Sequence, residues 1–289
     1  FLSPQPIERS FNLKNDLILN INIGKEPETL DEVIVKAVRV DATSPITHSN
    51  VTKKDLEKRN LGQDIPILLN FLPSVVTTSD AGAGIGYTGI RIRGINAQST
   101  NITINGIPYN DAESLGTFWV NLGDFASSVE SLQLQRGVGT STNGSGAFGA
   151  SINVLTDAVS NDANAEISNA FGSYNTRKHT VKFSTGKLFQ DVENNRSVEI
   201  AVRLSNINSD GYIDRASTDL KSYFLQGSYV DDNRLIKAVT FGGKEVTYQS
   251  WNGIDAETLA NDRTFNSAGM YTDANGNIRF YDNEVDNYS

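Results

Sequence analysis

Cysteine is absent from the 289 residues, and histidine occurs only at His48 and His179. Without cysteine there is no disulfide framework and no thiolate-bound metal. Two distant histidines, with no His-Glu-x-x-His motif, make a catalytic zinc site improbable. Neither a Ser-His-Asp nor a Cys-His arrangement can be assembled. The residues give an enzyme no positive support, and we expect neither a cofactor nor a metal.

Long apolar runs are also missing. No stretch of eighteen apolar residues occurs, so no transmembrane helix is expected, although barrel strands would escape such a scan. The net charge is -9 with no basic stripe, which makes nucleic acid a poor partner. The chain begins at Phe1 rather than Met, so we expect a processed or partial chain.

Glycine is plentiful, at 24 residues, and helix-forming runs are short. Residues 1–26 contain an alternating run at 17–23, and we interpret them as the tail of an upstream β-rich domain and a linker. Residues 30–37 form a short β-branched run behind two acids, for which an ordinary strand is the simplest interpretation.

Residues 38–157 alternate helix and strand signals and predict a small α+β domain. Thr52 and Asp55 are spaced as a capping box, and Asp64 is placed to cap a second helix. Asn105-Gly106 predicts a tight turn. The side chains expected to face the core from the second helix are Ile65, Leu68, Leu69 and Leu72.

Residues 161–289 change to a period of two. In 198–205, valine, isoleucine and leucine occupy one face, while the other carries Glu199, Ala201, Arg203 and Ser205. Long polar connections at 209–219 and 249–289 alternate with a tight turn at 231–234 and a longer one at 187–196. The pattern suits an outer-membrane barrel or a soluble sandwich, and periodicity alone leaves both open.

Several local motifs are set aside. Gly84 to Gly89 matches a dinucleotide fingerprint, but an alternating strand pattern follows it in place of a helix. The glycine-rich loop 137–149 lacks the ending of a phosphate loop. Asp273, Asn275, Asn277 and Glu284 have a loose calcium-loop spacing, but a surface hairpin is the better interpretation.

Four aromatic residues lie in or beside polar, glycine-rich loops, where they could contact a ligand or anchor the core. They are Tyr87, Tyr109, Phe118 and Trp119.

Five segments in order resemble the plug of TonB-dependent outer-membrane receptors. Residues 72–75 are similar to its Pro-Gly-Val segment with Ser74 for glycine, and 90–94 to its Ile-x-Ile-Arg-Gly strand. Residues 105–108 resemble its Asp-Gly-Ile-Pro turn, 130–137 its Glu-x-Ile-x-Val-x-Arg-Gly strand, and 144–156 its closing strand. The motif positions are Gly94, Asn105, Gly106, Glu130, Gly137 and Gly149.

The resemblance implies an α+β plug at 38–157 followed, at 161–289, by the first antiparallel transmembrane strands and extracellular loops of an incomplete barrel. About 22 strands are expected in the full protein. It implies a TonB box at 30–37, with Asp31, Glu32, Val33, Ile34 and Val35 binding TonB by strand addition. It also implies that Arg93 and Arg136 lock the plug to barrel glutamates.

The function implied is active import of a scarce nutrient, such as a metal chelate of the iron-siderophore type, across the bacterial outer membrane. Its partners would be periplasmic TonB, outer-membrane lipid and the small ligand. A glycan or cobalamin importer is the alternative within the family, and a soluble binding or adhesion protein is the alternative outside it.

Overall fold

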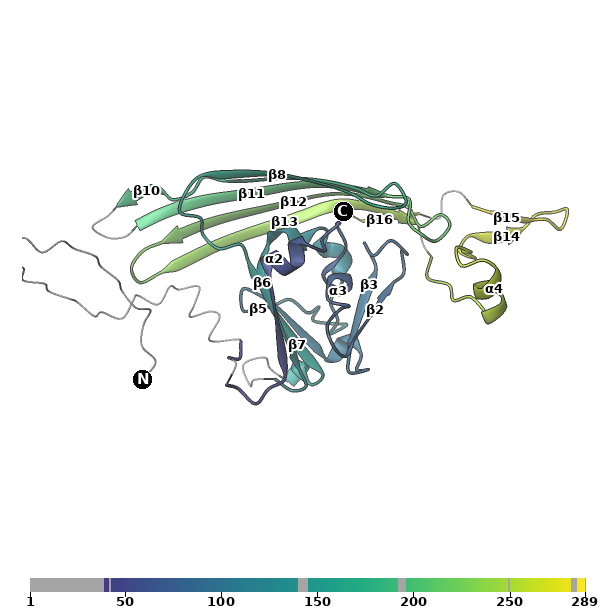
Figure 1. Ribbon diagram of the computed structural model, residues 1–289, viewed down its shortest axis with the longest axis horizontal. Helices are drawn as coiled ribbons and strands as arrows, with labels where there is room; N and C mark the ends of the chain where they lie inside the picture. The colour runs from purple at the N-terminus through teal and green to yellow at the C-terminus, as the bar shows by residue number, and fades with distance from the viewer. Residues whose placement is uncertain are drawn as a thin grey trace, which may run out of the picture.

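The computed structural model describes residues 39–41, 43–139, 145–191, 196–248, 250–281 and 285–288. A small N-terminal domain, whose last strand ends at Thr156 and which extends to Asp157, lies against one face of a large curved sheet that begins at Asn164 (Figure 1). The predicted segments 1–26 and 30–37 lie outside the described residues. No helix in the described ranges is long and apolar enough to cross a membrane.

The N-terminal domain is built on a five-stranded sheet in the order β1-β6-β7-β4-β5. The β4–β7 pair is parallel and the other pairs are antiparallel. A separate hairpin, β2–β3, stands beside this sheet. The strands are β1 (His48–Thr52), β2 (Val75–Ser79), β3 (Thr88–Ile92), β4 (Thr100–Ile104), β5 (Ile107–Pro108), β6 (Val129–Arg136) and β7 (Ala150–Thr156).

Two short helices pack beside these strands. Helix α2 (Lys53–Glu57) begins with the predicted capping box, since the side chains of Thr52 and Asp55 each accept the other's backbone N–H. Helix α3 (Ile65–Leu68) begins after Asp64, but the Asp64 side chain makes no capping bond. The capping role predicted for Asp64 is therefore wrong. The short 3-10 turns are η1 (Ala97–Ser99), η2 (Trp119–Leu122), η3 (Phe125–Ser128) and η5 (Ser145–Ala147).

One apolar core unites the N-terminal domain. The predicted core side chains after Asp64 all lie in it, together with β-strand residues such as Ile92, Leu132 and Ile152, which are fully buried. The Asn105-Gly106 turn joins β4 to β5 with φ of 51° and 81°, the left-handed values that a two-residue hairpin turn requires.

The curved sheet is antiparallel, in the order β16-β13-β12-β11-β9-β8. Its strands are β8 (Asn164–Phe171), β9 (Arg177–Ser184), β11 (Arg196–Ser209), β12 (Thr218–Val230), β13 (Leu235–Tyr248) and β16 (Val285–Tyr288). The segment 187–196, predicted as a turn, contains an extra strand, β10 (Leu188–Asp191), which pairs with β11. That prediction missed the strand because two of its four residues are polar and the run is short.

The two faces of the curved sheet differ in polarity. The face toward the N-terminal domain buries mostly polar side chains: Lys178, Thr180, Ser184, Ser197, Glu199, Arg203, Ser205, Ser222, Gln226, Ser228, Glu245 and Thr247. The opposite face exposes apolar ones: Ile167, Phe171, Val181, Phe183, Ile200, Leu204, Tyr223, Leu225 and Ile236. A soluble sandwich packs apolar inner faces together. The sandwich alternative is therefore wrong.

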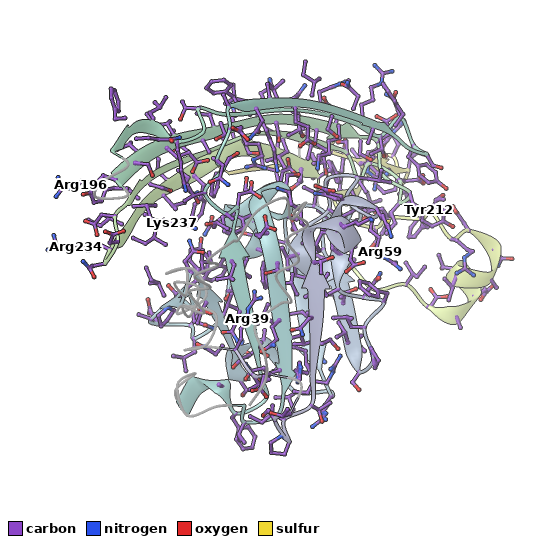
Figure 2. All side chains as sticks on the ribbon, turned by 60° about the vertical axis from the view of Figure 1, so that its left-hand side comes forward. Arg39, Arg59, Arg196, Tyr212, Arg234 and Lys237 are labelled. Carbon is purple, nitrogen blue, oxygen red and sulfur yellow. The ribbon has the colours of Figure 1, made fainter. Side chains whose placement is uncertain are left out.

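The two ends of the curved sheet differ as well. Figure 2 shows Arg196 and Arg234 at one end, where the chain makes the tight turn 231–234, and Tyr212 at the other. Beyond the Tyr212 end, the connection after β13 contains α4 (Ala256–Asn261) and a hairpin of β14 (Met270–Thr272) and β15 (Ile278–Phe280) (Figure 1). Asp273 accepts backbone N–H bonds within this hairpin turn, so the predicted surface hairpin is confirmed; Glu284 lies outside the described residues.

Candidate functional site between the two domains

The contact between the N-terminal domain and the curved sheet is centred on Asp124. This residue precedes η3 in a left-handed conformation, φ 49°, which turns its side chain toward the sheet. The Asp124 side chain is 0% exposed, and its carboxylate lies 2.8 Å from Lys178 Nζ of β9 and 2.8 Å from Arg203 Nη1 of β11. One domain supplies the anion and the other both cations.

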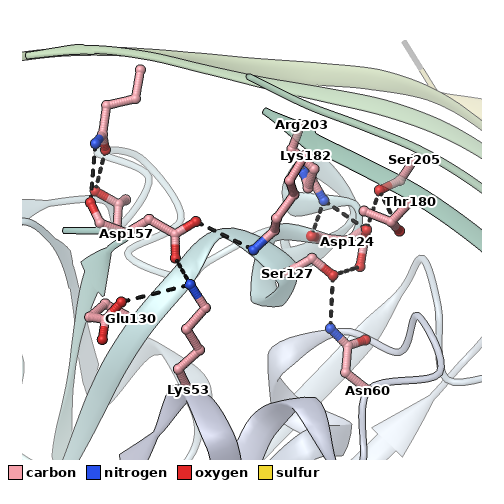
Figure 3. A network of polar contacts seen from close by, with 12 residues as sticks. Lys53, Asn60, Asp124, Ser127, Glu130, Asp157, Thr180, Lys182, Arg203 and Ser205 are labelled. Carbon is pink, nitrogen blue, oxygen red and sulfur yellow. Dashed lines mark hydrogen bonds and ion pairs between the residues drawn. The ribbon is translucent and has the colours of Figure 1, made fainter. Parts of the chain in front are cut away.

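Hydroxyl groups complete the bonding of the Asp124 carboxylate. Ser127 Oγ donates to it at 2.6 Å, and Ser205 Oγ of β11 donates to its other oxygen. Burial alone would raise the pKa of this carboxyl, but Lys178 and Arg203 outweigh burial and hold the Asp124 pKa below its usual value. Figure 3 shows Asn60 joining the same network by donating to Ser127 Oγ at 2.9 Å.

A second ionic contact involves Asp157, at the end of the N-terminal domain. Its carboxylate lies 2.8 Å from Lys53 Nζ of the same domain and 3.4 Å from Lys182 Nζ of β9 (Figure 3). The Asp157 backbone carbonyl accepts a bond from Gln226 Nε2 of β12 at 3.1 Å. Here too a carboxylate of the N-terminal domain meets a cation of the sheet.

Aromatic rings fill the space between these polar contacts. Phe125 packs edge-on against Phe224 and Phe241, with centroids 5.7 and 5.0 Å apart. The ring centroid of Tyr109 lies 6.2 Å from that of Phe241. Edge-to-face rings at such spacings attract one another beyond their burial of area. Phe224 is 3% exposed and belongs to the core of the N-terminal domain, although it comes from β12.

Cavities remain along this interface. One of about 340 Å³ is bordered by Tyr109, Asn121, Leu220 and Glu245. Another, of about 290 Å³, is bordered by Lys53, Asp157, Glu199 and other mostly polar residues. The contact therefore consists of a few strong ionic and aromatic points separated by open, partly polar space. Such an interface can hold two bodies in register and still be separated contact by contact.

The family model described as the TonB-dependent receptor plug domain matches residues 40–151, the stretch that folds into the N-terminal domain. The curved sheet follows it directly. The N-terminal domain is thus similar to the plug of the TonB-dependent receptors. The N-terminal domain is hereafter the plug, and the sheet formed by β8–β13 and β16 is the wall.

Curated relatives carry receptor and transporter names. The probable TonB-dependent siderophore receptor PirA of Acinetobacter baumannii is 25% identical over 84% of this chain and 32% of its own length. The vitamin B12 transporter BtuB of Vibrio vulnificus is 27% identical over 65% of this chain and 30% of its own. The chain thus spans about a third of the length of the relatives it matches.

Solved structures agree on the fold. The ferric citrate transporter FecA in its unliganded form matches with a TM-score of 0.59 at 18% identity, over 78% of this chain and 34% of that one. The ferripyoverdine receptor of the Pseudomonas aeruginosa outer membrane matches with a TM-score of 0.58 at 15% identity, over 86% and 30%. The predicted fold, a plug followed by antiparallel strands of an incomplete barrel, is confirmed.

The arginines predicted as locks lie on the plug near one another. Arg136 is 7% exposed and donates to the Pro73 carbonyl at 3.1 Å and to Ser49 Oγ at 3.0 Å, both within the plug. Burial, and then Arg93, lower the pKa of Arg136. Arg93 is exposed, with φ 54°. In the described strands, neither arginine forms an ion pair with the wall, so their locking role stays a prediction.

The plug-motif residues shape turns and close approaches. Asn105 bonds Thr156 through both side-chain atoms, tying the β4–β5 turn to the end of β7. Gly149 passes so close to Ile95 and Ser99 that an added Cβ would lie 2.7 and 3.0 Å from them. Gly94, Gly106 and Gly137 all have positive φ. Glu130 Oε2 lies 3.8 Å from Lys53 Nζ, at the edge of the Asp157 contact.

The four candidate ligand-binding aromatics are scattered. Tyr87, 38% exposed, lies in the loop between β2 and β3, and Phe118 is 48% exposed. Tyr109 faces the wall through Phe241, which favours an anchoring role. Trp119 is 3% exposed within the plug core, where a bound ligand has no access to it.

Sequence reasoning missed the central residues of the interface, Asp124, Lys178 and Arg203. Each stands alone in its local sequence, and 54 and 79 positions separate Asp124 from its two cations. One signal was present for Arg203, because the alternating run 198–205 placed it on the polar face of its strand.

Proposed function

We propose that this chain is the gating plug and the opening wall strands of a receptor that imports a scarce nutrient across the bacterial outer membrane. The observation that carries the proposal is the polarity of the wall, which is apolar on the face away from the plug and polar on the face toward it. A barrel in lipid needs this arrangement, because its outside meets hydrocarbon while its lumen holds water or a plug.

Across neighbouring wall strands, the outward residues form continuous apolar rows. Ile167, Val181, Leu204 and Tyr223 are register partners on successive strands, and each is between 44% and 74% exposed. In water such rows would favour aggregation, whereas in a membrane they contact lipid acyl chains. Outer-membrane lipid is therefore the environment that we propose for this face.

Gating follows from the plug–wall contact. While Asp124 and Asp157 are paired with wall cations and the Phe125 ring is seated between Phe224 and Phe241, the plug stays against the wall. Transport requires that these contacts be broken or rearranged by an external pull. We propose that TonB supplies the pull by adding a strand to residues 31–35, a segment outside the described residues. The proposed activity is transport rather than catalysis.

The proposed ligand is a metal chelate of the siderophore type, because the curated relative that matches 84% of this chain is named a probable siderophore receptor. A cobalamin ligand is the second candidate, since the vitamin B12 transporter BtuB is 27% identical over 192 residues. Both are bulky molecules that exceed the size at which passive pores suffice.

The test deletes residues 30–37 from the full-length protein, which is expressed in a bacterium that has an outer membrane. Surface binding of a ferric siderophore should persist, whereas its energy-dependent uptake should be lost, because the plug no longer offers a grip to TonB. Parallel uptake of labelled cobalamin distinguishes the two ligand classes. A matched deletion within the loop 255–262 serves as a control that should leave coupling to TonB intact. Full uptake by the variant lacking 30–37 would overturn the proposal.

A further inference from the structure

Two buried carboxyl groups face each other across the plug–wall interface without a cation between them. Asp64, directly before α3 in the plug, is 3% exposed, and Glu245, on β13 of the wall, is 2% exposed. Neither carboxyl group forms an ion pair within the described residues, unlike Asp124 and Asp157. An isolated buried carboxylate is strongly disfavoured.

Three of the four carboxyl oxygens lack a donor. Asp64 Oδ2 accepts from Thr88 Oγ1 at 2.8 Å, whereas Asp64 Oδ1 and both oxygens of Glu245 have no hydrogen-bond partner among the described residues. The Asp64 side chain could have capped α3 and does not; it points toward β3 instead. A buried carboxylate that lacks donors and a cation is costly, whereas a protonated carboxyl is neutral and can also donate, so these unfilled positions favour protonation.

Gly86 marks where the two domains approach most closely at this point. Its φ is +92°, and a Cβ placed on it would lie 2.6 Å from Glu245 Oε1. Any larger residue would collide with the carboxyl group. The glycine-rich segment 84–89, which carried no function in the sequence, thus accommodates the Glu245 carboxyl of the wall.

Within the described part of the chain, no cation acts on Asp64. The charged groups that act on it are Glu245 and Asp124, both acidic, and only hydrogen bonds from the Thr88 side chain and the Gly86 backbone favour its charged form. Lys178 and Arg203, cations of the interface, are bonded to Asp124. On the wall, Glu245 has Leu220 as its register partner on β12. No group of three metal-ligating side chains occurs within the described ranges, which leaves a proton as the simplest neutralising species.

We propose that the Asp64–Glu245 pair retains at least one proton while the plug is seated, and that loss of this proton drives the plug and the wall apart at this contact. The proton comes from water and returns to water, so no other reactant is needed. The inference rests on the plug–wall contact of the proposed function, but not on which nutrient is carried.

The sign of the pH dependence follows from Asp64. Burial, and then the Glu245 carboxyl, raise the pKa of Asp64 well above its usual value. A carboxyl whose pKa is higher in the folded protein stabilises it fully below the unfolded pKa and loses that contribution as pH rises through the folded value. The contact is therefore strongest in acid and weakens toward alkaline pH, opposite to the Asp124 contact.

The experiment uses the intact receptor in lipid vesicles and two readouts. Infrared spectra at about pH 7 should contain a protonated-carboxyl band, at a pH where exposed carboxyls with a pKa of roughly 4 are ionised. Glu245→Gln should remove or shift this band. It should also raise the unfolding midpoint at about pH 8, where the carboxyl is most costly, and flatten its dependence on pH. Exposed Asp232→Asn is the matched control, which should change neither readout.

Each other outcome decides against the proposal. A band that is absent from the wild type means that the pair is ionised, and a band that Glu245→Gln leaves unchanged means that the protonated carboxyl lies elsewhere. A midpoint that falls equally at every pH means that Glu245 has an ionic partner. Stabilisation by added Ca²⁺ or Mg²⁺ that is lost in Glu245→Gln means that a metal neutralises the pair. Should Glu245→Gln fail to fold, the infrared band of the wild type, compared with Asp64→Asn, still decides. The infrared band and the unfolding midpoint do not depend on nutrient uptake. An uptake assay can therefore contradict the proposed function without deciding whether the pair is protonated.

Discussion

Asp124 of the plug and Lys178 of the wall form a 2.8 Å ion pair whose side chains are 0% and 5% exposed. The pair joins the plug to the wall, and its two residues are 54 positions apart in the sequence. Arg203, the third member, is 2% exposed and is the largest fully buried side chain among the described residues. A buried cluster that spans two bodies stabilises their contact only while it is complete, because removing one member leaves unpaired charge behind.

Replacing Asp124 by alanine should therefore weaken the seated plug. Lys178 and Arg203 would be left buried without an anion, at a cost of about 3–5 kcal/mol in the free energy of unfolding. Chemical denaturation of the intact receptor measures the loss. The control is Asp219→Ala, which removes a 4.0 Å contact with Lys221 between side chains that are 49% and 69% exposed, and should cost at most about 1 kcal/mol. Equal effects of the two variants would contradict the role of the cluster.

The Asp124 contact should fail in acid. Because the pKa of Asp124 is lower in the folded protein than its usual value, its stabilisation is present above the unfolded pKa and is lost as pH falls through the folded pKa. The midpoint of thermal unfolding should drop below about pH 4 in the wild type. Asp124→Asn should be less stable than the wild type at neutral pH, and its midpoint should fall less in acid. A parallel decline in both proteins would assign the acid sensitivity to other carboxyls.

Substitution of Gly149 tests how closely its backbone packs against Ile95 and Ser99. Gly149→Ala puts a Cβ at 2.7 Å from Ile95 and 3.0 Å from the Ser99 carbonyl, contacts that require the backbone to shift. Overpacking of this kind costs about 1–3 kcal/mol. Gly146→Ala is a matched control three residues away, since nothing lies within 4 Å of its added Cβ. Denaturation midpoints of the two variants should differ clearly, and a harmless Gly149→Ala would mean that the segment adapts freely.

Substitution of Phe224 tests the aromatic contact between Phe125 of the plug and the wall. Although Phe224 belongs to the wall, it is 3% exposed within the plug core, so Phe224→Ala should cost about 3–5 kcal/mol. Phe224→Leu keeps most of the volume and should cost less than half as much. Proteolysis of the plug in the assembled receptor gives a second readout, because a loosened plug is cleaved faster. Unchanged stability and protection in Phe224→Ala would show that the ring does not join the two domains.

Local signals in the sequence predicted local structure well. Thr52 and Asp55 form the expected capping box, Asn105-Gly106 forms the expected turn, and the alternation in 198–205 correctly groups Glu199 and Arg203 on one face. These features depend on neighbours within a few positions, where spacing has a direct geometric meaning. The resemblance then supplied the arrangement of plug and barrel, which periodicity had left open between barrel and sandwich.

The interface itself could not be predicted, because its partners meet only in the folded chain. Asp124 has no periodic relation to Lys178 or Arg203, and Asp64 has none to Glu245. Asp64 shows how tertiary structure overrides a local preference: its sequence position is that of a helix cap, yet its side chain bonds Thr88. Trp119 is similar, since a loop-like sequence context placed it near the surface while the core buries it.

The central claim, that the wall separates lipid from a polar interior, can be tested most directly by a cysteine scan of β11. The native chain has no cysteine, so each introduced thiol reports alone. Fluorophores at Ile200→Cys and Leu204→Cys, on the apolar face, should be quenched by lipid-borne quenchers, whereas those at Ala201→Cys and Ser205→Cys should not. Quenching that shows no alternation along the strand, or water accessibility at all four positions, would contradict the account.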